Sequence, residues 1–139
     1  MATALVFLGA GSANRQPVLD YDQLILLDAE NLAEGGVKEG YAKVFSALQK
    51  HVKTPAVVTE AADHDMPKYS VFSSGIRYEI YGPGVAEGHS WGNATFALFS
   101  IVNRQLSGST HRFYAINGGN DLGGMFLTEG QGACQKVCV

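Results

Sequence analysis

The sequence predicts a single α+β domain, in which a mixed, mainly antiparallel sheet packs against two amphipathic helices. Two long segments carry apolar residues at helical spacing, and several shorter segments are apolar or alternating and are bounded by turn residues. The order of these elements offers few parallel crossover units, which favours α+β over a doubly wound sheet. With 139 residues the chain has the usual size of one domain, so we expect residues 1–139 to form one unit.

The N-terminal third is expected to contain two buried strands and the first helix. Residues 3–8 and 23–27 are short apolar runs, separated by a loop rich in glycine and other turn residues. In the stretch 37–52 apolar residues recur on one helical face. Pro55 ends this helix, because the residue before a proline is pushed out of the helical region.

Five further segments have the length, composition and flanking turn residues expected of strands: 56–60, 69–72, 76–81, 111–116 and 125–128. Between the first two of these strands, residues 61–68 read as a polar loop. Residues 73–75, Ser-Ser-Gly, are the best hairpin turn in the chain. In 76–81 apolar and polar side chains alternate, which predicts one face on the core and one face in solvent.

The second helix is expected at 90–106. Its apolar face is wide enough to include Trp91 and Phe96, which predicts deep burial, and Ser90 is a candidate N-cap. The chain from about residue 129 is rich in glycine and is expected to form a loose tail.

The loop 117–124 is the most unusual stretch of the sequence. It contains four glycines, which allow positive φ and close backbone approach. Asn120 and Asp121 can hydrogen-bond local amides in such a loop. It is either an elaborate hairpin connection or a contact with a ligand or partner, because loops on a rigid scaffold often carry function.

Composition and charge limit the classes of partner. The net charge is −3 and the ten basic residues are scattered, which argues against nucleic acid and suits a basic partner. The apolar run 4–8 has no basic residues before it and is too short for a signal segment, and nothing approaches the length of a membrane helix. We therefore expect a cytoplasmic protein without a membrane partner.

No motif establishes catalysis, a metal site or a cofactor. Gly9 and Gly11 follow a predicted strand, but the third glycine of a dinucleotide loop is missing, so a plain strand–loop–strand connection competes with nucleotide binding. The run 63–65, Asp-His-Asp, is either a solvated loop or part of a metal ligand set. Cys134 and Cys138 are too few to complete a structural zinc site. We expect no catalytic residues, no metal and no cofactor.

The histidines give no catalytic pair from sequence. His51 lies at the C-terminus of the predicted first helix, where positive charge is favourable for structural reasons. His89 precedes a helix and His111 begins a strand, and His64 lies in the polar loop. A serine or other nucleophile beside one of them is not recognisable from the sequence.

Two stretches of the sequence resemble a known class of bacterial proteins. They are Trp-Gly-Asn-Ala-Thr-Phe-Ala-Leu-Phe-Ser-Ile-Val-Asn at 91–103 and Phe-Tyr-Ala-Ile-Asn-Gly-Gly-Asn-Asp-Leu-Gly-Gly-Met-Phe-Leu-Thr at 113–128. Residues 27–37 have a similar character. The resemblance is to the small immunity proteins of polymorphic-toxin and type VI secretion systems.

The resemblance implies a cytoplasmic protein without enzymatic activity, which binds one cognate toxin and blocks its active site. The toxin would be a nuclease or another effector that acts in the cytoplasm, and acidic loops can occupy a basic nuclease cleft. Eight acidic or amide residues are the candidate partner-binding residues: Asp28, Glu30, Glu34, Glu60, Asp63, Asp65, Asn120 and Asp121. For each of them, ordinary solvated surface is the alternative.

Two other functions remain open at this point. One is a small-molecule-binding domain or small hydrolase that uses loop 117–124 together with Tyr114 or His111. Its mark would be a pocket beside the loop with convergent polar side chains. The other is a structural module of a larger assembly, whose mark would be a large exposed apolar patch.

Overall fold

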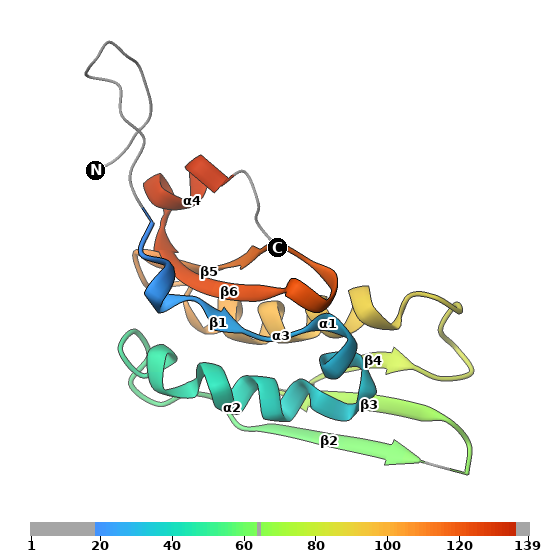
Figure 1. Cartoon of the computed structure of the whole chain (residues 1–139). Helices are drawn as coiled ribbons and strands as arrows, with labels where there is room; N and C mark the ends of the chain where they lie inside the picture. Colours follow the sequence, from blue (N-terminus) through green and yellow to red (C-terminus); the bar gives the residue numbers. More distant parts are fainter. Residues whose placement is uncertain (1–18, 64, 136–139) are drawn as a thin grey trace, which may run out of the picture.

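The computed structural model describes residues 19–63 and 65–135 and shows an α+β fold (Figure 1). Its strands form two separate three-stranded sheets, and each pair of neighbouring strands is antiparallel. Two helices, α2 (Val37–Leu48) and α3 (Ser90–Gln105), lie between the sheets and contact each other. The predicted fold class is confirmed, with the expected strands divided between two sheets.

Sheet A has the order β1-β6-β5 and consists of β1 (Ile25–Leu26), β6 (Gly123–Thr128) and β5 (His111–Ile116). Its two faces bury different clusters. Phe113 and Ala115 belong to the main core, whereas Tyr114 and Ile116 pack in a second cluster on the other face. Burial on both faces explains why the last four residues of β5, 113–116, form a continuous apolar run.

Helix α4 (Glu129–Gln135) follows β6 and contacts both β5 and β6. The Gln131 Oε1 atom accepts hydrogen bonds from the backbone N–H and the hydroxyl of Thr128, and the N–H of Gln131 donates to that hydroxyl. This reciprocal pair is a capping box. Gly132 lies against the ring of Tyr114, where any larger residue would overlap it. The expectation of a loose tail is therefore wrong for residues 129–135.

Sheet B has the order β2-β3-β4 and consists of β2 (Val58–Asp63), β3 (Lys68–Ser73) and β4 (Ile76–Tyr81). The expected hairpin turn is confirmed, with Ser74 and Gly75 both at positive φ, as a two-residue turn of this kind requires. The strand expected at 56–60 begins and ends later, because its pairing with β3 continues to Asp63 opposite Lys68.

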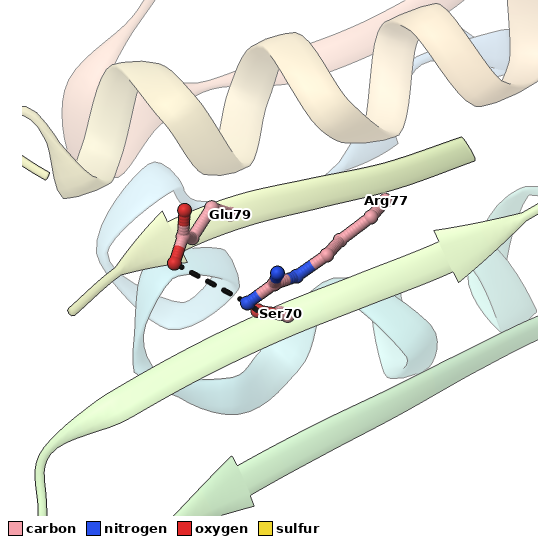
Figure 2. Close-up of polar contacts among 3 residues, drawn as sticks. All are labelled: Ser70, Arg77 and Glu79. Carbon is pink, nitrogen blue, oxygen red and sulfur yellow. Dashed lines mark hydrogen bonds and ion pairs between the residues drawn. The ribbon is translucent and has the colours of Figure 1, made fainter. Parts of the chain in front are cut away.

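The outer face of sheet B is exposed, as the alternation in β4 predicts. Figure 2 shows the Arg77 guanidinium beside Glu79 and Ser70 on this face. Its Nη2 atom lies 3.3 Å from Glu79 Oε2 and 3.5 Å from Ser70 Oγ. The opposite face of the sheet carries buried Val71 and Ile80 into the core.

Helix α2 buries most of the predicted apolar face, but Phe45 is exposed and the helix ends at Leu48, before the end of the predicted range 37–52. A short helix, α1 (Ala29–Asn31), comes before α2, and the kinked turn Leu32–Gly36 joins the two. Helix α3 occupies the expected range and buries most of the predicted apolar face, but two aromatic residues of that face are exposed. Trp91 and Phe96 are 40% and 59% exposed, and Ser90 is not the N-cap, which is His89. The buried residues of α3 are Ala94, Ala97, Leu98, Phe99, Ile101 and Val102.

Several sequence-based expectations lie outside the described residues. They concern the strand at 3–8, the glycine pair at 9–11, His64, and the side chains of Cys134 and Cys138. Within the part of the chain that the structure does describe, no helix is both long and apolar enough to cross a membrane.

Candidate functional site

The turn between β1 and α1 has an unusual backbone conformation. Asp28 has φ 64° and ψ 106°, a region that residues with a side chain seldom adopt. Two hydrogen bonds fix this turn, because the N–H groups of Leu27 and Asp28 both donate to the carbonyl oxygen of Leu122, at 2.8 and 3.0 Å. Such a conformation costs about 1–3 kcal/mol and persists only where its surroundings enforce it, often at functional sites.

The side chain of Asp28 joins this turn to the loop after β5. Its Oδ1 atom caps α1 by accepting hydrogen bonds from the N–H groups of Glu30, at 3.0 Å, and Asn31, at 3.4 Å. The Asn120 Nδ2 atom, 92 positions further along the chain, donates to the same Oδ1 atom at 3.0 Å. It also donates to Glu30 Oε1 at 3.0 Å. One neutral amide therefore holds two carboxylates close together.

Asp28, Asn31 and Asn120 border an open hollow with a volume of about 590 Å³. Two leucines and six polar or charged residues line it: Leu26, Leu27, Asp28, Asn31, Lys43, Asn117, Asn120 and Asp121. Besides Asp28, Asn117 also has positive φ, at 63°. In the described part of the chain the only other non-glycine residue with positive φ is Ser74, which lies in the hairpin turn. Backbone strain outside that turn is thus concentrated at the hollow.

Carboxylates outnumber cations around the hollow. Across residues 19–63 and 65–135, the ion pair between Arg77 and Glu79 is the only one within 4.0 Å. No described basic side chain forms an ion pair with Asp28, Glu30 or Asp121, although Lys43 lines the same hollow. Because the amide that holds Asp28 and Glu30 is uncharged, their negative charge remains available to a cationic group from outside.

The structure divides the eight predicted partner-binding residues into two groups. Three of them line the hollow, Asp28, Asn120 and Asp121, and a fourth, Glu30, adjoins it through its hydrogen bond from Asn120. Glu34 is exposed in the kinked turn that follows α1. The remaining three, Glu60, Asp63 and Asp65, lie on β2 or in the turn that follows it.

Glu60 takes part in a tertiary cap for α2. The N-cap residue of this helix is Gly36, which provides no side-chain cap. Instead, the N–H of Val37 donates to the Tyr69 hydroxyl at 3.0 Å, and that hydroxyl donates to Glu60 Oε1 at 2.7 Å. The N–H of Lys38 also donates to Glu60 Oε1, at 3.4 Å. Burial raises the pKa of Tyr69 far above its ordinary value, and the Glu60 carboxylate raises it further, so the hydroxyl stays a donor.

Asp63 organises the turn between β2 and β3. Its Oδ1 atom accepts hydrogen bonds from the N–H groups of Asp65, at 3.0 Å, and Met66, at 3.2 Å. Asp65 itself is exposed. The described residues contain no group of three or more His, Cys, Asp or Glu side chains that could hold a metal ion. The metal hypothesis for 63–65 also involves His64, which lies outside the described residues.

A histidine pair at the end of α2 was not predicted from the sequence. The rings of His51 and His111 have centroids 4.5 Å apart, and His51 also stacks on Phe126 at 5.2 Å. These three residues come from distant parts of the chain, so no local spacing could reveal the contact. His111 begins β5, whereas loop 117–124 follows the other end of that strand. Tyr114 is buried in the second cluster, so neither residue lines the hollow.

Comparisons of this chain with protein-family models, with curated proteins and with solved structures found no match.

Proposed function

We propose that this chain is a cytoplasmic immunity protein, which binds a cognate bacterial toxin and blocks its active site. The observation that carries the proposal is a group of three carboxylates that form no ion pair with a described basic side chain: Asp28 and Asp121 line the hollow, and Glu30 adjoins it through Asn120. They outnumber Lys43, the one basic residue that lines the hollow. A toxin that acts on nucleic acid presents a basic cleft to its substrate. An acidic surface that enters the cleft competes with that substrate and is attracted to it over a long range.

The rigidity of the hollow also supports binding to a protein surface. The hydrogen bonds from Asn120 to Asp28 and Glu30 fix the carboxylates before any partner arrives. The two bonds to the Leu122 carbonyl fix the backbone beneath them. A surface ordered in advance loses less conformational entropy on association, which increases affinity.

The experiment is affinity capture with the tagged chain from a lysate of its source, followed by toxicity tests of the captured protein. We expect one stoichiometric partner, which arrests growth when expressed alone and is silenced by this chain. Reversing the charge of Glu30 and Asp121, both exposed, should weaken that complex about tenfold or more at low salt. Most of the loss of affinity should come from a lower association rate, which surface plasmon resonance measures.

The matched control is Glu87→Lys, which reverses an exposed charge in the segment before α3. It should leave the affinity within about twofold of the unchanged chain, because isolated surface charges contribute little. Capture of no partner from a lysate shown to contain the product of the neighbouring gene would contradict the proposal. So would a non-toxic partner, or a complex that the double reversal does not weaken.

The hollow also favours a second candidate, the binding of a small cationic ligand. Its volume lies within the range of small-molecule sites, and several polar side chains converge on it. Thermal unfolding with millimolar spermidine or arginine tests this candidate. A rise in melting temperature that the Glu30 and Asp121 reversals abolish would support a small-ligand site, and no rise would favour the protein partner.

A further inference from the structure

Strand β2 is an uncovered edge of sheet B. The sheet order is β2-β3-β4, so among the described residues β2 has a neighbour on one side only. The backbone N–H and C=O groups on its other side are available to pair with another strand. Four consecutive residues of β2, from Thr59 to Ala62, are exposed.

Lysine, proline and a bulge, which often protect such an edge, are absent from β2, and its charged residues are all acidic. Natural edge strands are guarded by lysine, proline, a bulge or a very short length. The segment Val58–Asp63 contains neither lysine nor proline and pairs with β3 in continuous register over six residues. The register shift in this sheet lies between β3 and β4, at Tyr69 and Ser70, away from the open edge.

An apolar groove lies beside the start of β2. It has a volume of about 450 Å³ and lies between α2 and the chain that enters β2, where Val57 is 76% exposed. Seven of its eight lining residues are uncharged and mostly apolar: Tyr41, Ala42, Phe45, Pro55, Ala56, Val57 and Val58. The eighth is Lys38. The groove shares no lining residue with the hollow at Asp28.

A hydrogen-bond network holds the rim of this groove in place before any ligand binds. The Tyr41 hydroxyl donates to the Ala56 carbonyl oxygen at 2.7 Å, and the Ala56 N–H donates to Gln105 Oε1 at 2.8 Å. The Gln105 Nε2 atom donates to the Tyr41 hydroxyl at 3.1 Å, which closes the network. Burial raises the pKa of Tyr41, although the hydrogen bond from Gln105 acts in the opposite direction. A groove with a fixed wall costs little to order when a ligand enters.

Charge indicates what can occupy the edge. Strand β2 carries Glu60 and Asp63 and no basic residue, and Asp65 follows it. Pairing with the same strand of a second copy would bring like charges together, which is unfavourable. An occupant with basic side chains along the strand and an apolar side chain at its end fits both the acidic edge and the apolar groove.

We propose that β2 and the adjoining groove form a docking surface for an extended segment of a partner protein. The segment adds to sheet B as a fourth strand, places a large apolar side chain between Phe45 and Val57, and presents lysine or arginine to Glu60. This inference concerns a different surface from the hollow and does not require the partner to be a toxin.

The test uses labelled synthetic peptides and the whole chain. The probe is a peptide of about eight residues that begins with two large apolar residues and then alternates valine with lysine. We expect saturable binding by fluorescence anisotropy at low salt, with shifts in the amide resonances of 57–63. Val57→Glu should weaken binding about tenfold or more, whereas Phe96→Glu, an exposed aromatic on α3, should leave it unchanged.

Two control peptides separate the parts of the inference. Replacing the lysines by glutamate should abolish binding through repulsion from β2, and methylating alternate backbone nitrogens should abolish it by removing the strand hydrogen bonds. Equal binding of either control peptide, or no binding of the probe, would overturn the proposal. It is also overturned if the β2 amides that do not pair with β3 resist hydrogen exchange in the free chain. In that case light scattering identifies what covers the edge: a dimer indicates a second copy of the chain, and a monomer indicates another segment of the same chain.

Discussion

At the scale of single residues, Tyr69 combines complete burial with hydrogen bonds to two different elements. Its side chain is completely buried, and its hydroxyl satisfies a backbone N–H at the start of α2 while it donates to Glu60. A helix whose N-cap is glycine needs such a partner, because its first N–H groups have no intrahelical acceptor. One hydroxyl group thus connects sheet B to α2.

Tyr69→Phe should lower the free energy of unfolding by roughly 1–3 kcal/mol, because it leaves a buried N–H without an acceptor and removes a hydrogen bond to a carboxylate. Urea unfolding followed by circular dichroism measures this change. Tyr21→Phe is the matched control, because Tyr21 is 56% exposed. Equal stabilities of the two variants would show that the hydroxyl does not cap α2.

At the scale of elements, sheet A depends on glycines in β6. Gly124 pairs with Ile25 on one side and Ala115 on the other, and a side chain there would overlap the ring of Phe113. Phe113 itself stacks on Phe99 of α3, with centroids 4.6 Å apart. The absence of a side chain in β6 therefore allows α3 and sheet A to share a close aromatic contact.

Gly124→Ala should destabilise the chain by about 1–3 kcal/mol, the usual cost of overpacking a filled core. Gly92→Ala is the matched control, because Gly92 lies in α3 with open space around the position of a Cβ atom. This second substitution should stabilise the chain by about 0.5–1 kcal/mol, since alanine favours a helix. Thermal unfolding of both variants checks the pair, and the same sign for both changes would refute the argument.

At the scale of the whole molecule, the His51 stack links α2 to sheet A. His51 follows the end of α2, and its ring lies against His111 of β5 and Phe126 of β6. Burial lowers the pKa of His51, and the charges of His111 and Lys50 lower it further. The other basic group of this region, Arg112, donates to the carbonyl oxygens of Leu106, Ser109 and His111. The folded chain therefore resists protonation of His51.

This linkage predicts the direction of a pH effect on stability. The unfolded chain takes up a proton on His51 near its ordinary pKa of about 6.5, whereas the folded chain does so only at lower pH. The stabilisation of the folded chain by neutral His51 is fully present above the unfolded-state pKa. It is lost as the pH falls toward the lower pKa of the folded state. His51→Gln should therefore reduce the loss of unfolding free energy between about pH 7.5 and about pH 5.5.

Urea unfolding at both pH values measures this difference. The control is His89→Gln, which replaces an exposed histidine before α3 and should leave the pH dependence unchanged. A steeper pH dependence in the His51 variant would show that the stack favours the protonated ring.

The sequence predicted the type of most elements because local patterns determine them. The apolar stripe of α2, the alternation in β4 and the turn at Ser74 and Gly75 all depend on residues within a few positions of one another. Helix α4 was missed although its capping box, Thr128 with Gln131, is also local, because the glycines of this segment favoured a loop.

The candidate site was predicted only as separate parts. The sequence placed Asp28 and Glu30 after a strand and Asn120 and Asp121 in a glycine-rich loop, without indicating that they meet. Tertiary structure decided this, because β1 pairs with β6 in the register Ile25 to Gly124 and so brings the two segments together. The separation of the strands into two sheets, the open edge of β2 and the His51 stack have the same origin. They depend on which distant segments share a core, and that choice is made by packing across the whole chain rather than by any local pattern.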